Sequence, residues 1–467
     1  MYTVFPPILG VCLSLFMLFM LSKKHNVKWC LLAFAIYYVV TFAYMGDFTM
    51  TGSFLINALA LIVVAPFSFF PYLLYALYYD KFDSFFFTLI FPVSYVCIEF
   101  IIPVLRISPG MNPCYFFFYA TPLIQCASLI GAAGLTFILA WFYASVITMI
   151  TKKFAVKYII SASVSAALVI GALVFGFIRL GASTPPSASV KTAWVTGPEI
   201  KCIDGEWERL PYMTNVDSFR NSAKEAYESG AEFLIFTEEA FSIEGEKTEA
   251  FLNIVSETAI EYGMPMLVGF DLDTADGNRE NVIYYINRDG EIVDRYVKHM
   301  VIPLVEAGYE IGANEVHSNT ETFACGPIKM AYTICYDGNF EVFVQQMIND
   351  ADFYLYPSWD WEAVEKKHTM IAGFRAVENG VTLAKPTFDG QSTLYDAYGR
   401  IIYKTNTDDG FEKVYTFDMP CDNRETFYEK YAEIEDIVVL AGAAALFVFA
   451  FINGILRRKK TAKSVTS

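Results

Sequence analysis

Long runs without charge dominate the first 180 residues and limit what this part of the chain can fold into. Seven runs contain no Asp, Glu, Lys or Arg: residues 4–21, 29–45, 54–79, 84–98, 114–150, 158–178 and 437–456. A helix needs about 20 apolar residues to cross a bilayer, and 114–150 is long enough for an interfacial segment followed by a span. The runs are apolar all round, unlike the striped helices of soluble proteins. We predict a bundle of about six transmembrane helices at residues 1–180 and a further transmembrane helix at 433–456.

The few basic residues near these runs are distributed unevenly. They form four clusters: Lys23, Lys24 and Lys28; Lys81; Lys152, Lys153 and Lys157; and residues 457–460. If the helices alternate, all four clusters fall on one side, and the opposite loops contain little but Arg106. Because Lys and Arg are enriched in cytoplasmic loops, this side is predicted to be cytoplasmic, with a basic cytoplasmic tail at 457–467. The region between the sixth and seventh spans would then lie on the outer face of a bacterial plasma membrane.

That region has a different composition. Residues 184–432 contain 20 basic and 43 acidic residues, a net charge of −23, which disfavours binding to nucleic acid. Residues 181–189 (GASTPPSAS) read as a linker. Residues 190–432 then alternate predicted strands and helices and include a hairpin signal at Asp289-Gly290. An α/β domain is therefore predicted. Its strands are expected at 190–195, 232–236, 265–270, 281–286, 291–296, 328–335, 353–356, 381–386, 392–395 and 400–404, and its helices at 218–229, 247–262, 341–348 and 362–378.

Three polar residues stand at the ends of predicted strands of this domain: Glu238, Lys298 and Cys335. Strand ends hold side chains rigidly beside loops, where α/β enzymes place catalytic groups. Cys335 would be a nucleophile, with its pKa lowered by a lysine and a helix N-terminus. Glu238 would take the thiol proton, and Lys298 would stabilise an oxyanion.

Each of these signals is weak when taken alone. A cysteine at a strand end is more often a small buried apolar residue, and a lysine after a hairpin is usually solvated. Glu238 also has an adjacent competitor, Glu239. The hypothesis depends on all three residues occurring together, each in its own local motif.

Residues from about 190 to 420 resemble the carbon–nitrogen hydrolase (nitrilase) superfamily. Residues 234–240 (LIFTEEA) are similar to the family strand that ends in Trp-Pro-Glu, which selects Glu238 over Glu239. Residues 296–306 (YVKHMVIPLVE) are similar to the family's lysine loop, so Lys298 would be the catalytic lysine and Glu306 a second essential glutamate. The resemblance implies an α-β-β-α sandwich with a Glu-Lys-Cys triad.

The nucleophile motif extends this resemblance. Residues 334–340 (ICYDGNF) are similar to the family's Ile-Cys-Tyr-Glu around Cys335, and Tyr336 and Asp337 are expected to support the site or its lid. His368 and residues 374–380 (FRAVENG) match the following helix. Several positions depart from the family pattern, among them Thr237 for proline and Asp337 for glutamate, which leaves the substrate open.

A membrane branch of this superfamily, the apolipoprotein N-acyltransferases, resembles the whole chain. Residues 122–137 (PLIQCASLIGAAGLTF) are similar to that branch's Gln…Gly…Gly segment, which soluble nitrilases lack. That branch has eight spans, whereas seven are found here. The resemblance implies transfer of an acyl chain from a phospholipid, through a cysteine thioester, to the amine of a diacylglyceryl-cysteine lipoprotein. No cofactor or metal is implied. A membrane-anchored amidase or nitrilase with water as acceptor is the alternative, and a non-enzymatic scaffold or transporter is a third reading.

Remaining features leave alternatives open. Cys202, Cys325 and Cys421 could form at most one disulfide if Cys335 is free, with no pairing preferred. The cluster at residues 359–361 (WDW) could be core or a lipid-facing rim. Glu99 could reach the membrane interface or be functional.

Overall fold

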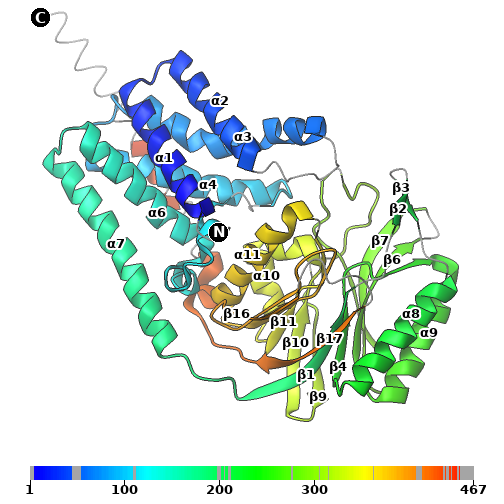
Figure 1. The fold of residues 1–467 in the computed structure, drawn as a ribbon. Helices are drawn as coiled ribbons and strands as arrows, with labels where there is room; N and C mark the ends of the chain where they lie inside the picture. Colours follow the sequence, from blue (N-terminus) through cyan, green and yellow to red (C-terminus); the bar gives the residue numbers. More distant parts are fainter. Residues whose placement is uncertain are drawn as a thin grey trace, which may run out of the picture. The chain divides into compact units, whose positions relative to one another are not determined.

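The structure is a computed structural model, which describes residues 5–44, 54–108, 112–196, 201–203, 206–208, 212–274, 277–303, 305–313, 315–360, 362–405, 413–434 and, near the C-terminus, 437, 441–442, 444–446, 448–449 and 452. The chain divides into two compact units (Figure 1). The helical unit comprises Met1–Leu105, Pro109–Ala182 and Lys430–Ser467, and the α/β unit comprises Arg106–Ser108 and Ser183–Glu429.

The helical unit confirms the expected series of apolar helices. Its elements are α1 (Phe5–Lys23), α2 (Val27–Tyr44), α3 (Phe54–Tyr78), η1 (Phe85–Leu89), α4 (Ile90–Val104), η2 (Pro113–Phe117), α5 (Thr121–Ile124), α6 (Ala127–Thr151) and α7 (Val156–Gly181). Within the described residues, Phe85–Val104, Ala127–Thr151 and Val156–Gly181 are long and apolar enough to cross a membrane. The 114–150 run is divided between η2, α5 and α6, as its length suggested. The predicted tail at 457–467 lies outside the described residues.

Neutral hydrogen bonds connect the helices of this unit. The Ser161 hydroxyl lies 2.7 Å from the Thr88 hydroxyl and 2.8 Å from that of Ser145. The Trp141 indole donates to Thr88 at 3.0 Å. These contacts join η1, α6 and α7 without using a charge. Glu99 is the exception among the described buried residues of this unit, because its carboxylate is buried in α4.

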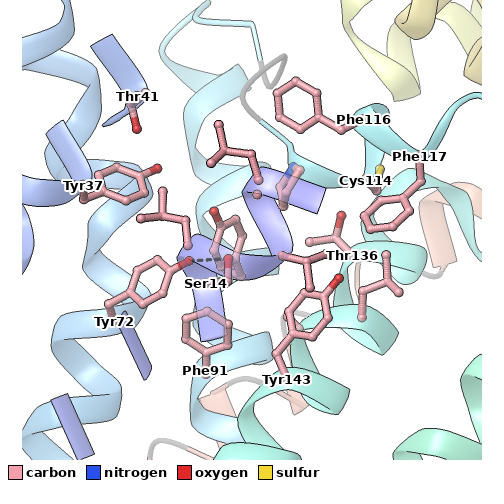
Figure 2. A pocket seen from close by; sticks show the side chains of 18 of the residues that line it. Ser14, Tyr37, Thr41, Tyr72, Phe91, Cys114, Phe116, Phe117, Thr136 and Tyr143 are labelled. Atoms are coloured by element: carbon pink, nitrogen blue, oxygen red, sulfur yellow. Dashed lines mark hydrogen bonds between the residues drawn. The ribbon is translucent and has the colours of Figure 1, made fainter. Parts of the chain in front are cut away.

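A cavity of about 120 Å³ opens among the helices (Figure 2). Aromatic rings such as Phe91 and Phe117 line it together with the hydroxyls of Tyr37 and Tyr143. A hydrogen bond of 2.8 Å joins the hydroxyls of Ser14 and Tyr72 at its wall. The helical unit therefore contains a largely apolar space with a few polar groups.

Two mixed sheets form the α/β unit. The first has the order β17-β1-β4-β6-β7-β8, with β5 paired to β6, and the second has the order β16-β15-β13-β11-β10-β9. The strands of the first are β1 (Ala188–Val195), β4 (Phe233–Phe236), β5 (Phe241–Glu244), β6 (Met266–Asp273), β7 (Arg279–Ile286), β8 (Ile292–Val297) and β17 (Val414–Cys421). Those of the second are β9 (Ser318–Phe323), β10 (Gly326–Tyr332), β11 (Phe353–Leu355), β13 (Thr382–Lys385), β15 (Thr393–Tyr395) and β16 (Ile401–Lys404).

The two sheets face each other across an apolar core. Trp194 and Phe233 from the first sheet and Met330 and Phe353 from the second meet there. The outer face of the first sheet packs against α8 (Tyr212–Glu228) and α9 (Gly245–Tyr262). Helices α10 (Glu341–Ile348) and α11 (Glu362–Asn379) cover the second sheet (Figure 1). The arrangement is an α-β-β-α sandwich, which confirms the predicted fold class.

Several strands have no counterpart in the sequence prediction. These are β5, β9, β17, the short pair β12 (Ser358–Trp359) and β14 (Thr387–Phe388), and the pair β2 (Lys201–Ile203) and β3 (Glu206–Glu208). β9 reads SNTETF, which lacks an apolar run. β10 ends at Tyr332 rather than at Cys335, so the nucleophile candidate lies three residues beyond its strand.

The cysteines of the α/β unit lie in different environments. Cys421 is buried at the end of β17, and Cys325 is exposed in the turn between β9 and β10. Burial first and then the nearby Cys325 raise the pKa of Cys421 to about 12. The side chain of Cys202 lies outside the described residues. The structure thus brings together Cys325 and Cys421, one of the pairings that the sequence left open.

Candidate active site

A turn after β4 positions Glu238. The strand ends at Phe236, and Glu239 then has a left-handed backbone with φ 47°. Gly269 on β6 lies under this turn, where a Cβ atom would come within 2.2 Å of the Thr237 carbonyl oxygen. The close approach therefore requires glycine at this position. The two adjacent glutamates diverge because of this turn.

The Glu238 carboxylate is held from three directions. It is 3% exposed, and its Oε1 accepts hydrogen bonds from Asn281 at 2.7 Å and from the Lys298 ammonium at 2.8 Å. Its Oε2 accepts from the backbone N–H of Trp359 at 2.6 Å. These donors fix the orientation of the carboxylate and satisfy its charge.

Lys298 lies between two carboxylates directly after β8. Its Nζ is 2.8 Å from Glu238 and 2.5 Å from Glu306 Oε1, and the side chain is 1% exposed. Burial disfavours the ammonium ion, but the two glutamates more than offset this and hold the pKa of Lys298 well above its ordinary value. Lys298 is therefore a permanent cation in the site.

Cys335 begins the short 3-10 helix η3 (Cys335–Asn339) in a strained backbone conformation, with φ 44°. A left-handed non-glycine residue is uncommon and is often associated with function. Its N–H donates to the Pro357 carbonyl at 2.9 Å, and its side chain is 2% exposed. The Glu238 carboxylate lies close enough to the thiol to raise its pKa. The structure thus brings Glu238, Lys298 and Cys335 together.

The expected lowered pKa of Cys335 is wrong. Burial raises the pKa of this thiol well above its ordinary value, and the Glu238 carboxylate acts in the same direction. Lys298 opposes both effects but does not overcome them. A nearby cation and a helix terminus favour the thiolate, but the desolvation of a buried thiolate outweighs them. The resting site is a thiol beside a carboxylate.

Asp337 connects the nucleophile turn to the lysine loop. Its Oδ1 accepts from the Met300 N–H at 2.6 Å, and its Oδ2 accepts from the Tyr296 hydroxyl at 2.6 Å and the Ile334 N–H at 3.0 Å. Burial raises the pKa of Asp337 to about 7, although the hydrogen bonds and Lys298 act in the opposite direction. Asp337 thus links the turn that contains Cys335 to the loop that follows Lys298.

Tyr336 contacts a short segment from the N-terminal half of the chain. Its hydroxyl accepts from the Ser108 N–H at 2.7 Å and donates to the Arg106 carbonyl at 3.4 Å. The Arg106 guanidinium in turn donates to the His299 carbonyl at 3.3 Å. Residues Arg106–Ser108 thus form part of the α/β unit, which the sequence did not suggest.

Glu239 has a different environment from Glu238. It is partly exposed, and burial first and then Asp271 and Glu238 raise its pKa well above the ordinary value. Asp271 itself pairs with Arg279. Glu239 therefore favours the protonated form, and among the described residues no hydrogen bond links it to Lys298 or Cys335.

The apolar loop between Lys298 and Glu306 is attached to the site through its backbone. The Ile302 N–H donates to Glu306 Oε2 at 2.6 Å, and the Ile302 side chain is buried. Pro303 and Val305 are exposed, and Leu304 lies outside the described residues. The loop combines a fixed base with an exposed apolar tip.

Trp359 and Asp360 contribute to the site in a way that the sequence did not reveal. Beside the contact with Glu238, the Trp359 carbonyl lies 3.9 Å from Cys335 Sγ. The Asp360 carboxylate, fully buried, pairs with His368 Nδ1 at 2.8 Å and with Lys385. A backbone contact has no sequence signature. From the sequence, the WDW cluster at residues 359–361 is interpreted only as part of the core or as a lipid-facing rim. Trp361 lies outside the described residues.

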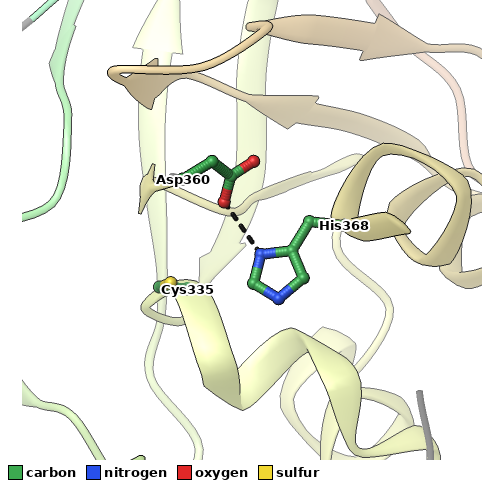
Figure 3. Close-up of side chains that lie close together, drawn as sticks. All are labelled: Cys335, Asp360 and His368. Atoms are coloured by element: carbon green, nitrogen blue, oxygen red, sulfur yellow. Dashed lines mark hydrogen bonds and ion pairs between the residues drawn. The ribbon is translucent and has the colours of Figure 1, made fainter. Parts of the chain in front are cut away.

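Cys335, Asp360 and His368 also form a group of possible metal ligands among the described residues, with donor atoms within 4.8 Å of one another (Figure 3). The Lys385 ammonium already contacts the second Asp360 oxygen. A metal cation here would face this positive charge at close range, so the donor set does not favour one.

Residues 207–422 match the family model of carbon-nitrogen hydrolase. This part of the chain, a little under half of its length, is therefore similar to that family. Among curated proteins, it is similar to apolipoprotein N-acyltransferase 2 of Treponema denticola, with 23% identity over 55% of this chain and 54% of that protein. It is also similar to the apolipoprotein N-acyltransferase of Geobacter metallireducens, with 23% identity over 71% of this chain and 67% of that protein. The predicted resemblance to this membrane branch is confirmed.

The chain spans about half the length of the Treponema relative. Among solved structures, an amidase from Nesterenkonia sp. aligns with 53% of this chain and 95% of its own, at 20% identity and a TM-score of 0.44.

Proposed function

We propose that this protein is an acyltransferase that moves a fatty acyl chain from a phospholipid, through a thioester on Cys335, to the N-terminal amine of a diacylglyceryl-cysteine lipoprotein. The observation that supports this most is the contact of one carboxylate, Glu238, with both a buried thiol and a buried lysine, in a chain that also has a unit of apolar helices. The similar curated proteins are named as apolipoprotein N-acyltransferases.

The first half-reaction forms the thioester. Glu238 takes the Cys335 proton as the sulfur attacks the ester carbonyl of the phospholipid, because the raised pKa keeps the resting thiol protonated. Lys298 stabilises the oxyanion of the tetrahedral intermediate. As this collapses, the lysophospholipid oxygen leaves and takes the proton from Glu238.

The second half-reaction transfers the acyl group. The acceptor amine attacks the thioester carbonyl, Glu238 takes a proton from the amine, and Lys298 again faces the oxyanion. The Cys335 sulfur then leaves and recovers its proton from Glu238. Glu306 keeps Lys298 charged throughout both half-reactions, since its carboxylate lies 2.5 Å from the ammonium.

Exclusion of water separates a transferase from a hydrolase, because water would discharge the thioester. The loop of Met300–Val305 is suited to form an apolar lid or lipid-entry rim, since its base is anchored and its described tip residues are exposed. We propose that the loop lies at the bilayer surface and admits the acyl chain.

Incubation with phospholipid vesicles tests this function. We expect a stable acyl adduct on Cys335, detected as a mass increase that hydroxylamine removes, and its discharge when a diacylated lipopeptide with a free amine is added. Cys335→Ala should form no adduct while still folding, and Cys335→Ser should be nearly as inactive. Steady release of free fatty acid without lipopeptide would instead establish water as the acceptor and a membrane-anchored hydrolase.

The proposed location is the outer face of a bacterial plasma membrane. Arg106, which the alternation of helices places on the outer side, belongs to the α/β unit, and this supports the orientation. A reporter that is active only outside the cytoplasm should work when fused near Lys404 and fail near Lys153. The reverse pattern would contradict the orientation.

A further inference from the structure

The backbone of Trp359 lies between the proposed base and the proposed nucleophile. Its N–H donates to Glu238 Oε2 at 2.6 Å, and its carbonyl lies 3.9 Å from Cys335 Sγ. The Cys335 thiol thus lies against the Trp359 carbonyl and close to the Glu238 carboxylate. A shift of the Trp359 backbone would change both the hydrogen bonding of the Glu238 carboxylate and the environment of the Cys335 thiol.

Backbone hydrogen bonds hold the segment on both sides of Trp359. Ser358 donates to the Pro386 carbonyl at 2.9 Å, and Asp360 donates to the Phe388 carbonyl at 3.0 Å. These contacts form the short parallel pair of β12 and β14. With two residues per strand, this pairing is too short to fix the Trp359 backbone firmly alone.

A buried ionic cluster provides a second constraint. The Asp360 carboxylate binds His368 Nδ1 at 2.8 Å and the Lys385 ammonium, and Lys385 also donates to the Thr387 hydroxyl at 2.9 Å. Lys385 and His368 outweigh the effect of burial and hold the pKa of Asp360 below its ordinary value. Asp360 therefore remains charged. Because its side chain is fixed, it also holds the adjoining backbone of Trp359 in place.

The ionic cluster also contacts η3, the short helix that contains Cys335. His368 Nε2 lies 3.2 Å from the Asn339 side-chain amide, and Asn339 ends the same short helix that Cys335 begins. Since the Asn339 amide is a donor, His368 accepts at Nε2 and donates from Nδ1 to Asp360. Figure 3 shows the His368 ring and the Asp360 carboxylate beside Cys335.

We propose that Asp360, His368 and Lys385 are positioning residues that fix the Trp359 backbone, on both sides of its Cα, against Glu238 and Cys335. The proposal rests on the proposed roles of those two residues. It differs from a purely structural role in one respect. Loss of the Trp359 hydrogen bond destabilises the ionised form of Glu238, so the pH dependence of Cys335 reactivity must move.

The test measures the rate of Cys335 alkylation by iodoacetamide as a function of pH, followed by mass spectrometry of the Cys335 peptide in the full-length protein in detergent. The acid limb of this profile is the range in which the alkylation rate rises with pH. In His368→Ala, this limb should shift to higher pH by about one unit, so that the alkylation rate at a given pH on the limb falls about tenfold. His368→Asn, whose amide can still donate to Asp360, should restore most of the rate.

Two further variants separate positioning from general stability. Glu378→Gln disrupts a fully buried ion pair with Arg375 on the same helix, α11, and should reduce stability without moving the profile. Thr387→Val removes only the hydroxyl beside Lys385, and should move the profile in the same direction by less. If His368→Ala does not fold, the alkylation profile of Thr387→Val tests the proposal instead.

An unmoved acid limb in folded His368→Ala, or in Thr387→Val when the alanine variant does not fold, would overturn the proposal. Alkylation requires no natural substrate, so this outcome is distinguishable from a failure of acyl transfer. If vesicles give no adduct but the profile moves as expected, the positioning role holds and the proposed substrate is wrong.

Discussion

Buried polar groups differ in kind between the two units. Among the described residues, those of the helical unit are neutral apart from Glu99, and most are Ser or Thr hydroxyls. The α/β unit buries many charges, several of them around the site; examples are Glu238, Lys298, Asp337, Asp360 and Lys385. Desolvating a charge is costly unless it is paired, whereas a hydroxyl costs far less. The difference indicates that the helical unit is built for an apolar environment and that the α/β unit concentrates its electrostatic cost where chemistry occurs.

Loss of a buried cation should have the largest effect. Lys298→Met would leave two buried carboxylates, Glu238 and Glu306, without their common partner. We expect no measurable turnover and a loss of roughly 3–5 kcal/mol in the free energy of unfolding, the range for breaking a buried pair. Lys152→Met in the helical unit is the matched control, because its partner Asp80, 3.5 Å away, is 61% exposed. It should cost about 0–1 kcal/mol, and equal losses in both variants would contradict the comparison.

The two adjacent glutamates provide the next largest contrast. Glu238→Gln should reduce the rate of acyl-enzyme formation by ~10²-fold or more, the usual scale for a general base. Glu239→Gln should have a mild effect, because Glu239 favours the protonated form and contacts neither Lys298 nor Cys335 through a described hydrogen bond. Single-turnover rates of both variants check this. A severe loss in Glu239→Gln alone would reverse the assignment.

Asp337 should make stability depend on pH. Its pKa is raised from 3.8 to about 7 by burial, so the folded state binds this proton more tightly than the unfolded state. The associated stability is fully present below pH 3.8 and is lost as the pH rises through about 7. The difference in free energy of unfolding between wild type and Asp337→Asn should therefore fall between about pH 4 and 7. Denaturant titrations across this range test it, and a constant difference would show that Asp337 does not titrate there.

A neutral contact in the helical unit should have the smallest effect. The Tyr75 hydroxyl lies 3.0 Å from the Thr148 hydroxyl, and both side chains are buried. Tyr75→Phe should reduce stability by about 1 kcal/mol and leave the rate of acyl-enzyme formation unchanged. Thermal unfolding in detergent and the adduct assay measure the two quantities. Loss of activity in the folded variant would mean that this unit does more than hold and present lipid.

The sequence predicted the α/β unit well where apolar runs were long and poorly where they were short. Helix α10 was predicted at its observed bounds because its ends coincide with clear changes in pattern. β9 and β12 were missed, since the first is polar and the second has two residues. Such strands form because neighbouring strands provide their hydrogen bonds, and this information is not local to the sequence.

For the candidate site, too, the sequence predicted some features and missed others. Motif spacing identified the three side chains that meet in the structure, Glu238, Lys298 and Cys335. It could not identify the Trp359 N–H, because a backbone donor has no residue type of its own. It also gave the wrong direction for the pKa of Cys335, because desolvation depends on what covers a thiol after folding.

The raised pKa of Cys335 has a consequence for survival of the enzyme between turnovers. Peroxides and other oxidants attack thiolates far faster than thiols. A buried thiol that ionises only when a substrate is attacked offers little thiolate to such oxidants. We therefore expect the resting protein to withstand exposure to hydrogen peroxide that converts an exposed, low-pKa cysteine to sulfenic or sulfinic acid, so that its nucleophile remains usable without a dedicated reducing partner.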